Sequence, residues 1–428
     1  MISIDQRLAV TSPTVVARLL ERIPVDDRRT VLRKYSEEFA SEILAEMNPE
    51  DSAEVVGAMR EWRAVQIIEE FDPDDAADIV AELDEVDRTR LLDKVDPETA
   101  HTVQALLAYE PDTAGGIMTP EYASVYPEMS ADQAINHIRD HYRETEDLYY
   151  IYVVDKEKHL LGVVSIRDLI LARPTHKIAE FMNIQVKGVC TPEMDREQVA
   201  LLIAEHNLFS LPVVGANNDI LGIVTVDDVI DIIQDEATED IQKLVGAGYD
   251  ESIHDKISYS LGKRHPWLQV NLLTAFMAAG IIFLFQNEIK QLTLLAVFMP
   301  VIASLGGNAG TQTLAVAIRS MALGEVSSDD QFKLCLRELS KGLINGVSVG
   351  IIAAFPVYFV THSLGIALII IISLILNMGL ACLLGALIPL LLRRFNLDPA
   401  QSSSIFLTAV SDVAGFFIFL SLGTWLLL

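Results

Sequence analysis

Five long apolar segments follow Trp267, and they constrain the fold of this chain more than any other feature. They cover approximately residues 267–285, 292–318, 343–360, 364–392 and 404–428. A helix needs about 20 mainly apolar residues to cross a lipid bilayer, and it satisfies its backbone hydrogen bonds without water. The sequence therefore predicts a multidomain membrane protein with an α-helical transmembrane bundle of five spans per protomer over residues 267–428.

Basic residues set the predicted orientation of these spans. Lys263 and Arg264 precede the first span, Arg393 and Arg394 lie between the fourth and the fifth, and four basic residues lie between the second and the third. Because basic loops stay on the cytoplasmic side of a membrane, the part of the chain before the spans is predicted to be cytoplasmic. An odd number of spans then places the C-terminus outside, and the predicted location is the plasma or inner membrane.

The net charge of −28 lies entirely in the first part of the chain. Residues 267–428 contain seven basic and seven acidic residues, so residues 1–266 carry the whole excess. An acidic surface of this density repels nucleic acid, which is therefore not a predicted partner, and it attracts cations. The three cysteines, Cys190, Cys335 and Cys382, show no paired spacing and predict neither a disulfide nor a zinc site.

Residues 1–115 have the pattern of a helical repeat. Pro49, Pro73 and Pro97 recur every 24 residues, and each follows an asparagine or an aspartate. An N-cap side chain followed by proline marks the start of a helix. Because apolar residues recur at helical spacing after each start, the region predicts an all-α superhelical N-terminal domain.

A duplicated unit occupies residues 116–240. The stretch LYYIYVVDKEKHLLGVVSIRDLI is matched by LFSLPVVGANNDILGIVTVDDVI, with Gly162 and Gly222 at equivalent positions. Each copy predicts a strand, a turn, a strand and a helix. Together the copies resemble a tandem pair of CBS domains, an α+β fold, divided into residues 116–178 and 179–240.

CBS pairs usually sense a small ligand, and this pair carries a short pattern that holds a nucleotide ribose in some CBS domains. The pattern, Ser or Thr followed by Asp three residues later, occurs from Ser165 to Asp168 and from Thr225 to Asp228. The resemblance leaves ATP open as a ligand, with Thr225 and Asp228 as the candidate contacts.

One carboxylate, Asp412, lies within the last apolar segment. It follows the start of that segment by about ten residues, which at ~1.5 Å per residue places it about 15 Å deep, near the middle of the bilayer. A lone carboxylate there costs at least ~2.5–3.5 kcal/mol on insertion scales, and no lysine or arginine lies at a similar depth. Asp412 therefore predicts a cation site within the membrane; the alternative is a protonated or hydrogen-bonded packing residue.

The second apolar segment contains the glycine-rich stretch PVIASLGGNAGTQT. Gly306, Gly307 and Gly310 each cost a helix about 1 kcal/mol relative to alanine, and irregular backbone at membrane depth persists only where it is buried or lines a cavity. The stretch therefore predicts an interruption of this span that lines an ion path with Gly306, Gly307 and Asn308. The alternative is close helix packing through Gly306 and Gly310.

Six motifs occur in a fixed order around the CBS pair. They are TAGGIMTPEY, VTVDDV, DEATEDIQKL, PVIASLGGNAGTQ, LLRRFNLDP and AVSDVAG. Together they resemble the MgtE family of magnesium channels over nearly the whole chain. The resemblance implies a homodimer in the lipid bilayer with a central pore, in which Asp412 is the pore aspartate. Two copies of Asp412 and the Thr408 carbonyl could then accept hydrogen bonds from Mg²⁺ that keeps its water. Relatives often carry asparagine before the pore aspartate, where this chain has serines from Ser402 to Ser404.

The same resemblance implies that cytosolic Mg²⁺ closes the pore by binding to the acidic soluble domains. Mg²⁺ is then both the transported and the regulatory ion, and a helix in the polar linker, residues 241–266, plugs the pore. Since ions only shift an existing equilibrium, they must bind the closed form better. The regulatory carboxylates that the resemblance implies are Asp74, Asp78, Asp228, Glu236, Glu239 and Asp240.

Two other functions stay open at the level of sequence. A coupled transporter or exporter of divalent cations such as Co²⁺ or Mn²⁺ would be favoured by a second ionisable residue within the spans, and only Asp412 and the edge residue Arg319 are evident. A membrane-anchored nucleotide sensor would act through the CBS pair. An enzyme is not predicted, because an intramembrane aspartyl protease needs two carboxylates and the chain shows no Ser-His or HExxH arrangement.

Overall fold

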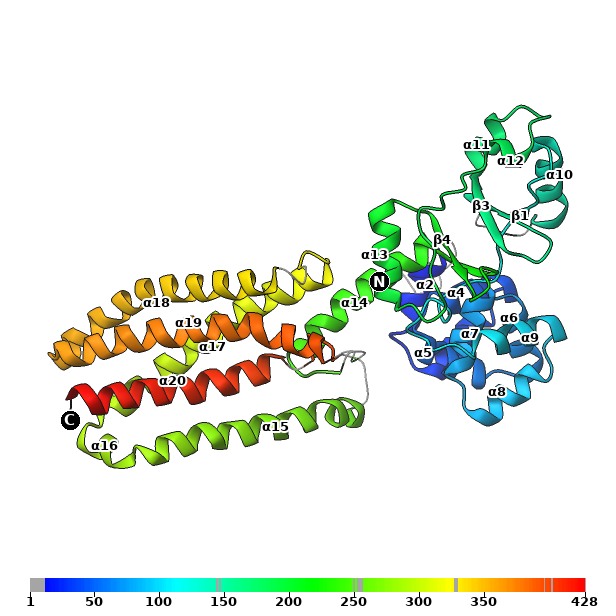
Figure 1. Cartoon of the computed structure of the whole chain (residues 1–428). Coiled ribbons are helices and arrows are strands. Elements are labelled where there is room, and N and C mark those ends of the chain that lie inside the picture. Colours follow the sequence, from blue (N-terminus) through cyan, green and yellow to red (C-terminus); the bar gives the residue numbers. More distant parts are fainter. Residues whose placement is uncertain are drawn as a thin grey trace. The chain divides into compact units, whose positions relative to one another are not determined.

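The computed structural model describes residues 12–143, 145, 148–248, 251, 257–326, 330–395, 397–401 and 403–427. The chain divides into two compact units, residues 1–235 and 236–428. Figure 1 traces the elements of each unit, and each is described by itself.

A stack of short helices opens the first unit. They are α2 (Pro13–Leu20), α3 (Val25–Leu32), α4 (Glu37–Ala45), α5 (Pro49–Gly57), α6 (Glu61–Glu69), α7 (Pro73–Ala81), α8 (Glu85–Leu92) and α9 (Pro97–Leu106). Each helix packs against the next but one, so the even-numbered and the odd-numbered helices form two rows. Buried side chains such as Ile43, Val56 and Ile67 join the rows in one core, which gives the predicted superhelix.

The predicted helix starts in this region are confirmed. Each of α5, α7 and α9 begins at the proline of the repeat. Asn48 and Asp96 accept hydrogen bonds from backbone amides of the first turn, as N-cap residues do. Asp72 occupies the same position without a side-chain cap bond.

Two copies of a strand–strand–helix unit follow. The first is β2 (Tyr150–Val154), β3 (Leu160–Ser165) and α11 (Ile166–Leu171), and the second is β4 (Ser210–Val214), β5 (Ile220–Thr225) and α14 (Val226–Leu244). The antiparallel register is the same in both: Val153 pairs with Gly162, Val213 pairs with Gly222, and a bulge follows each pair. The duplication in the sequence is therefore a duplication of the fold.

Further elements complete each copy. They are β1 (Ser124–Val125), α10 (Ala131–His141) and α12 (Ile178–Phe181) in the first, and α13 (Arg196–His206) in the second. β1 lies parallel to β2 at the edge of a three-stranded sheet. The two copies pair through their turns, because the Leu160 amide donates to the Asn218 carbonyl at 2.9 Å and the Ile220 amide donates to the Lys158 carbonyl at 3.1 Å.

The second unit contains five helices that are long and apolar enough to cross a membrane. They are α15 (Ile257–Leu284), α17 (Leu294–Ala322), α18 (Gln331–Thr361), α19 (Leu364–Arg394) and α20 (Ser403–Leu427), and the short α16 (Gln286–Gln291) joins α15 to α17. α19 is central and packs against α17, α18 and α20, whereas α15 lies at the edge of the bundle and is almost uncovered (Figure 1).

Two spans begin earlier than predicted. α15 begins at Ile257 and contains Pro266, which the sequence had suggested as a boundary. α18 begins at Gln331, twelve residues before the predicted start, because its polar first turns continue the helix without adding apolar signal. The predicted linker, residues 241–266, is shared between the end of α14 and the start of α15, and residues 249, 250 and 252–256 lie outside the described residues.

Candidate ion path and cation-binding sites

Asp412 lies in α20, partly buried, one turn after Thr408. Its carboxylate makes no ion pair or hydrogen bond with any residue that the structure describes. The neighbouring Ser411 is buried and donates to the Thr408 carbonyl at 3.1 Å, the same carbonyl that accepts the backbone bond of the Asp412 amide within α20. The sequence predicts that no basic residue neutralises Asp412, and none does so among the described residues.

The serines before Asp412 fix the start of α20. Ser403 Oγ donates to the Pro399 carbonyl at 2.6 Å, and Ser404 Oγ donates to the Leu244 carbonyl at 2.5 Å. The second of these bonds satisfies a carbonyl at the C-terminal end of α14, which has no partner within its own helix. Ser402, the third serine of the predicted set, lies outside the described residues.

The glycine-rich stretch does not interrupt α17, contrary to the prediction. The helix runs without a break from Leu294 to Ala322. A Cβ at Gly306 would lie 2.2 Å from Asn377 Nδ2, and a Cβ at Gly310 would lie 2.9 Å from Leu407. Because α19 and α20 approach α17 at these glycines, the low helix propensity is offset by close packing, as the small-residue alternative requires.

Gly307 and Asn308 lie on a different face of α17. Nothing lies within 4 Å of a Cβ placed at Gly307, and Asn308 is exposed together with Ser304 and Gln312, one turn on either side. Exposed polar side chains at membrane depth need water or another polar partner. This polar stripe can therefore line a wet path or an interface between protomers, whereas Gly306 belongs to the packed core beside it.

Two helix contacts fix the level of Asp412 along the bundle. A Cβ at Gly423 would meet Leu295, and a Cβ at Gly310 would meet Leu407, so α17 and α20 run antiparallel. Asp412 follows Leu407 by five residues, which places it about level with Leu305 and within one turn of Gly307. The predicted pore residues on the two helices therefore share one depth.

Asn377 of α19 joins the three helices at this depth. It is fully buried, and its Nδ2 donates to the Ile302 carbonyl of α17 at 2.9 Å. Gly306 on α17 and Gly415 on α20 leave the space that its amide fills. Its Oδ1 has no hydrogen-bond partner among the described residues. Asn377 thus holds α17 and α20 in register beside Asp412.

A group of carboxylates lies in the first unit, on α7 and at the start of α14. Asp74 Oδ1 is buried and has no hydrogen-bond partner within the described part of the chain. Burial raises the pKa of Asp74 well above its usual range, and Asp75 and Asp228 raise that pKa further. Burial also raises the pKa of Asp75 to about 7 and the pKa of Asp78 to about 6, and Asp228 contributes to both shifts.

This group has the donor set that a hard divalent cation needs. Asp74, Asp75, Asp78 and Asp228 offer only oxygen, which Mg²⁺ and Ca²⁺ prefer. Burial and neighbouring carboxylates disfavour the charges of Asp74, Asp75 and Asp78, and an opposite charge removes both penalties. The predicted Asp74, Asp78 and Asp228 are therefore brought together, and Asp75 is a fourth member that the sequence did not single out.

The raised pKa values predict how stability depends on pH. Asp75 and Asp78 have folded pKa values of about 7 and about 6, above the usual 3.8, so the folded state binds protons more tightly than the unfolded state. Without a divalent cation, their contribution to stability is present below about pH 4 and is lost as the pH rises towards 7. Mg²⁺ competes with those protons, so its stabilising effect should grow over the same interval.

We expect Mg²⁺ at about 100 times its Kd at pH 8 to raise the unfolding temperature by roughly 5 °C or more at that pH, and the same Mg²⁺ concentration to raise it by clearly less at pH 5.5. Differential scanning fluorimetry of the full chain in detergent measures this. Asp228→Asn should reduce the shift, whereas Asp227→Asn, an exposed neighbour, should leave it unchanged. An equal Mg²⁺ shift at both pH values would contradict the site.

A second group of carboxylates lies in the second unit, at the C-terminal half of α14. Lys243 pairs with Glu239 and, at 2.7 Å, with Asp398. Burial raises the pKa of Asp240 to about 6; Asp398 and Glu236 raise it further, and Lys243 lowers it. The structure thus brings the predicted Glu236, Glu239 and Asp240 together with Asp398, in the loop before α20, and supplies one lysine among them.

The two nucleotide patterns have different surroundings. Thr225 is buried and donates to Asp228, beside the carboxylates of α7, and neither residue lines the cavity between the two copies. That cavity, of about 190 Å³, is lined by Ser165, Asp168 and Lys187, among others. Ser165 Oγ lies 2.7 Å from Asp168 Oδ2. The structure thus places a cavity beside Ser165 and Asp168, the equivalent pair of the first copy, and carboxylates of α7 beside the predicted Thr225 and Asp228.

Glu338 was missed by the sequence analysis. It lies in α18 with a side chain that is only 6% exposed, it pairs with Lys341, and it accepts a hydrogen bond from Thr313 at 3.3 Å. It is a second carboxylate within a candidate span, hidden because the helix was expected to begin at residue 343. Its own lysine neutralises it, so it does not compete with Asp412 as an unpaired anion.

Comparison with known proteins covers most of the chain. The matching family models are the MgtE intracellular N domain over residues 11–112, the CBS domain over residues 114–174 and 178–235, and the MgtE divalent cation transporter over residues 299–422. The magnesium transporter MgtE of Thermus thermophilus is 38% identical over 76% of this chain and 72% of its own length. The magnesium transporter MgtE of Enterococcus faecalis is 35% identical over 76% of this chain and 71% of its own length.

One solved structure has a similar fold. It is the crystal structure of the cytosolic domain of the Mg²⁺ channel MgtE in complex with ATP, with a TM-score of 0.51 and 39% identity, covering 53% of this chain and 92% of that chain. The helical N-terminal domain, the CBS pair and the five candidate membrane helices confirm the predicted fold class. The chain therefore belongs to the MgtE family of divalent cation transporters, whose named relatives above are magnesium transporters.

Proposed function

We propose that two copies of this chain form a Mg²⁺ channel in the plasma or inner membrane. Mg²⁺ enters through it with its water shell, and cytosolic Mg²⁺ closes it. The soluble domains lie in the cytoplasm, and the C-terminus lies outside. The observation that carries the proposal is the group of four carboxylates around Asp74, in which a buried oxygen has no partner in the described structure. The magnesium transporters among its relatives support the choice of ion.

The pore is built around Asp412. On a two-fold axis, two Asp412 carboxylates face one another, and their repulsion is relieved by a divalent cation between them. Thr408, Gly307 and Asn308 lie near the same depth, where the Thr408 hydroxyl and the Asn308 amide offer oxygens to the water of the ion. Because Mg²⁺ dehydrates reluctantly, a site that binds its water rather than the bare ion allows fast passage.

The gate uses the carboxylates of α7 and α14. Without a bound cation, the ionised carboxylates of α7 repel Asp228 and disfavour the packing of α7 on the start of α14. These carboxylates are Asp74, Asp75 and Asp78. Bound Mg²⁺ supplies the positive charge that this packing needs. Asp240 lies towards the C-terminal end of the same helix. Its pKa is raised by burial and by the neighbouring carboxylates of Asp398 and Glu236. The carboxylates thus hold α14 in one position only when they are neutralised, and that position is the closed one.

Single-channel recording tests the gate. In inside-out patches we expect the open probability to fall as cytosolic Mg²⁺ rises through the millimolar range. Asp74→Asn combined with Asp228→Asn should keep the channel closed at Mg²⁺ concentrations at which the native protein is open, because the neutral amides no longer need the ion. Asp227→Asn is the matched control and should close normally. If the open probability of the native channel did not depend on cytosolic Mg²⁺, the proposed gate would be wrong.

A second role is favoured by the cavity between the CBS copies. We propose that this cavity binds ATP and modulates the channel, with Ser165 and Asp168 on the ribose; the ATP complex of a similar cytosolic domain supports it. Calorimetric titration of ATP into the full chain should show binding that Asp168→Asn weakens by about tenfold, since a hydrogen bond to a charged group is lost. Thr225→Val, at the equivalent position of the other copy, should bind normally. Loss of binding in Thr225→Val instead would place the nucleotide at the originally predicted contacts.

A further inference from the structure

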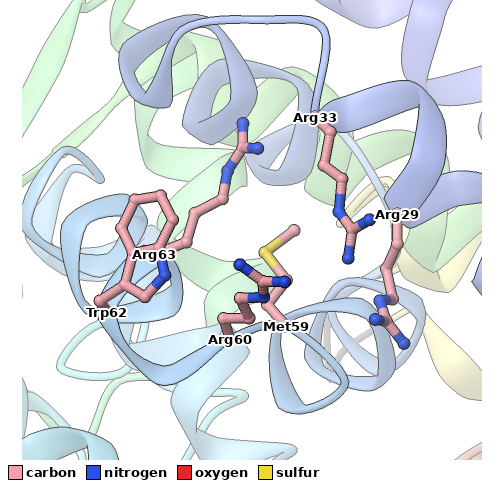
Figure 2. Close-up of a pocket in the computed structure, with 6 residues that line it drawn as sticks. All are labelled: Arg29, Arg33, Met59, Arg60, Trp62 and Arg63. Atoms are coloured by element: carbon pink, nitrogen blue, oxygen red, sulfur yellow. The ribbon is translucent and has the colours of Figure 1, made fainter.

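A basic cavity lies in the helical N-terminal domain, at the junction of the end of α3 with the start of α6. It measures about 300 Å³ and is lined by Arg29, Arg33, Met59, Arg60, Trp62 and Arg63 (Figure 2). Four guanidinium groups around one cavity repel one another, and they stand out in a chain whose net charge is −28. Neither the proposed pore nor the proposed gate uses this cavity.

Arg63 is the fixed element of this site. Its side chain is 11% exposed, and its Nη2 donates to the Leu32 carbonyl at 2.9 Å and to the Tyr35 carbonyl at 3.1 Å. Its Nε is buried with no hydrogen-bond partner among the described residues, and Glu37 lies 3.8 Å away. One buried N–H of a fixed cation is therefore still without an acceptor.

Arg33 and Arg60 are the free elements. Both are exposed, and neither forms an ion pair with a residue that the structure describes. Arg29 pairs with Asp26 at 3.4 Å, but that carboxylate is 93% exposed and so contributes little. In Figure 2, Arg33 and Arg60 extend from opposite sides towards the middle of the cavity, where Met59 lies. Arg33 and Arg60 thus present their guanidinium groups to a ligand rather than to acids of the described chain.

We propose that this cavity binds a nucleotide with two or more phosphate groups. Guanidinium groups donate paired hydrogen bonds in a plane that matches phosphate oxygens, and several of them around one space require an anion of more than one charge. Trp62 borders the same cavity with 56% of its surface exposed, and an exposed indole face stacks well on a base. A volume of about 300 Å³ is at the lower end of the range for small-ligand pockets.

Trp62 is the reporter that separates this site from any nucleotide bound to the CBS pair. The chain has three tryptophans, and Trp267→Phe with Trp425→Phe leaves Trp62 as the sole emitter. In this full-length background, in EDTA, we expect ADP to quench Trp62 fluorescence saturably. Inorganic tripolyphosphate should compete with ADP because it binds the same arginines, and adenosine alone should bind at least about tenfold more weakly because it lacks them.

A pair of charge-matched variants completes the test. Arg33→Ser with Arg60→Ser should raise the Kd of ADP by about tenfold or more, since charge-assisted hydrogen bonds are lost, and both residues are exposed, so the fold should persist. Arg139→Ser with Arg173→Ser removes two exposed arginines of the first CBS copy and should leave the Kd of ADP unchanged.

No quenching at millimolar ADP, equal quenching in both variants, or equal affinity for adenosine and ADP would each overturn the proposal. Trp62 emission that changes with protein concentration without ligand would also overturn it, because an acidic segment of a second copy would then fill the cavity.

Discussion

Replacing Asp412 by alanine is expected to lower Mg²⁺ flux into proteoliposomes about tenfold or more. The Asp412 carboxylate makes no ion pair or hydrogen bond within the described structure, so its charge is available to a passing ion. Two protomers would lose two charges from one axis, which removes the attraction that draws a hydrated cation to the middle of the membrane. A fluorescent Mg²⁺ indicator inside the liposomes measures the flux.

Stability is the control that separates transport from folding. Asp412→Asn removes a charge that is costly in the membrane, so this variant should be at least as stable as the native protein and still transport poorly. Glu325→Ala removes an exposed carboxylate just after α17 and should transport normally. Undiminished flux in Asp412→Ala would refute the proposed pore.

The same proteoliposomes distinguish a channel from a coupled transporter. A channel current reverses at the Mg²⁺ equilibrium potential, whereas coupling to protons shifts the reversal with the pH gradient. The described structure adds Glu338 to the carboxylates of the spans, but Lys341 neutralises it. A reversal that follows the pH gradient would favour the coupled alternative and would make Glu338 the first residue to substitute.

Valine at Gly306 is expected to destabilise the fold, whereas valine at the adjacent Gly307 is expected to leave it intact. A Cβ at Gly306 would lie 2.2 Å from Asn377 Nδ2, whereas a Cβ at Gly307 meets nothing within 4 Å. Gly306→Val must displace the buried amide that joins α17, α19 and α20, and overpacking of this kind costs about 1–3 kcal/mol, sometimes more. Gly307→Val should keep the fold.

Thermal unfolding followed by size-exclusion chromatography measures the difference between these adjacent positions. Gly306→Val should aggregate at a lower temperature than the native protein. Gly307→Val should unfold with the native protein yet conduct less, if its side chain enters the proposed ion path. Equal stability of the two variants would contradict the packing that the structure assigns to Gly306.

Local signals predicted the fold well because they act within a few residues. The prolines at 49, 73 and 97 mark helix starts wherever the rest of the chain lies, and each is the first residue of a helix. The duplicated strands pair in the same register in both copies, and both copies have a bulge at the equivalent position, after Val153 and after Val213. The depth of Asp412 follows from counting residues along one helix.

The errors arose where the deciding contact is distant in sequence. Gly306 contacts Asn377, which lies 71 residues later. The low helix propensity of Gly306 can be predicted from the sequence, but the close packing that offsets it cannot. Asp398 lies far in sequence from the carboxylates of α14, and the structure joins it to them because Lys243 pairs with both Glu239 and Asp398. The two nucleotide patterns are likewise alike in sequence, yet Asp228 beside Thr225 lies close to acids from α7, whereas Ser165 borders a cavity. Spacing alone cannot separate these cases.

The helix α14 has a thermodynamic consequence. It is one continuous helix, and Asp228 in its first turn and Asp240 near its end are twelve residues apart, about 18 Å at 1.5 Å per residue. If both carboxylate groups bind Mg²⁺ by restraining this helix, occupancy of either changes the affinity of the other by the same factor, because binding free energies around a closed cycle must balance. The chain would then respond to Mg²⁺ more steeply than either group alone, without any contact between them.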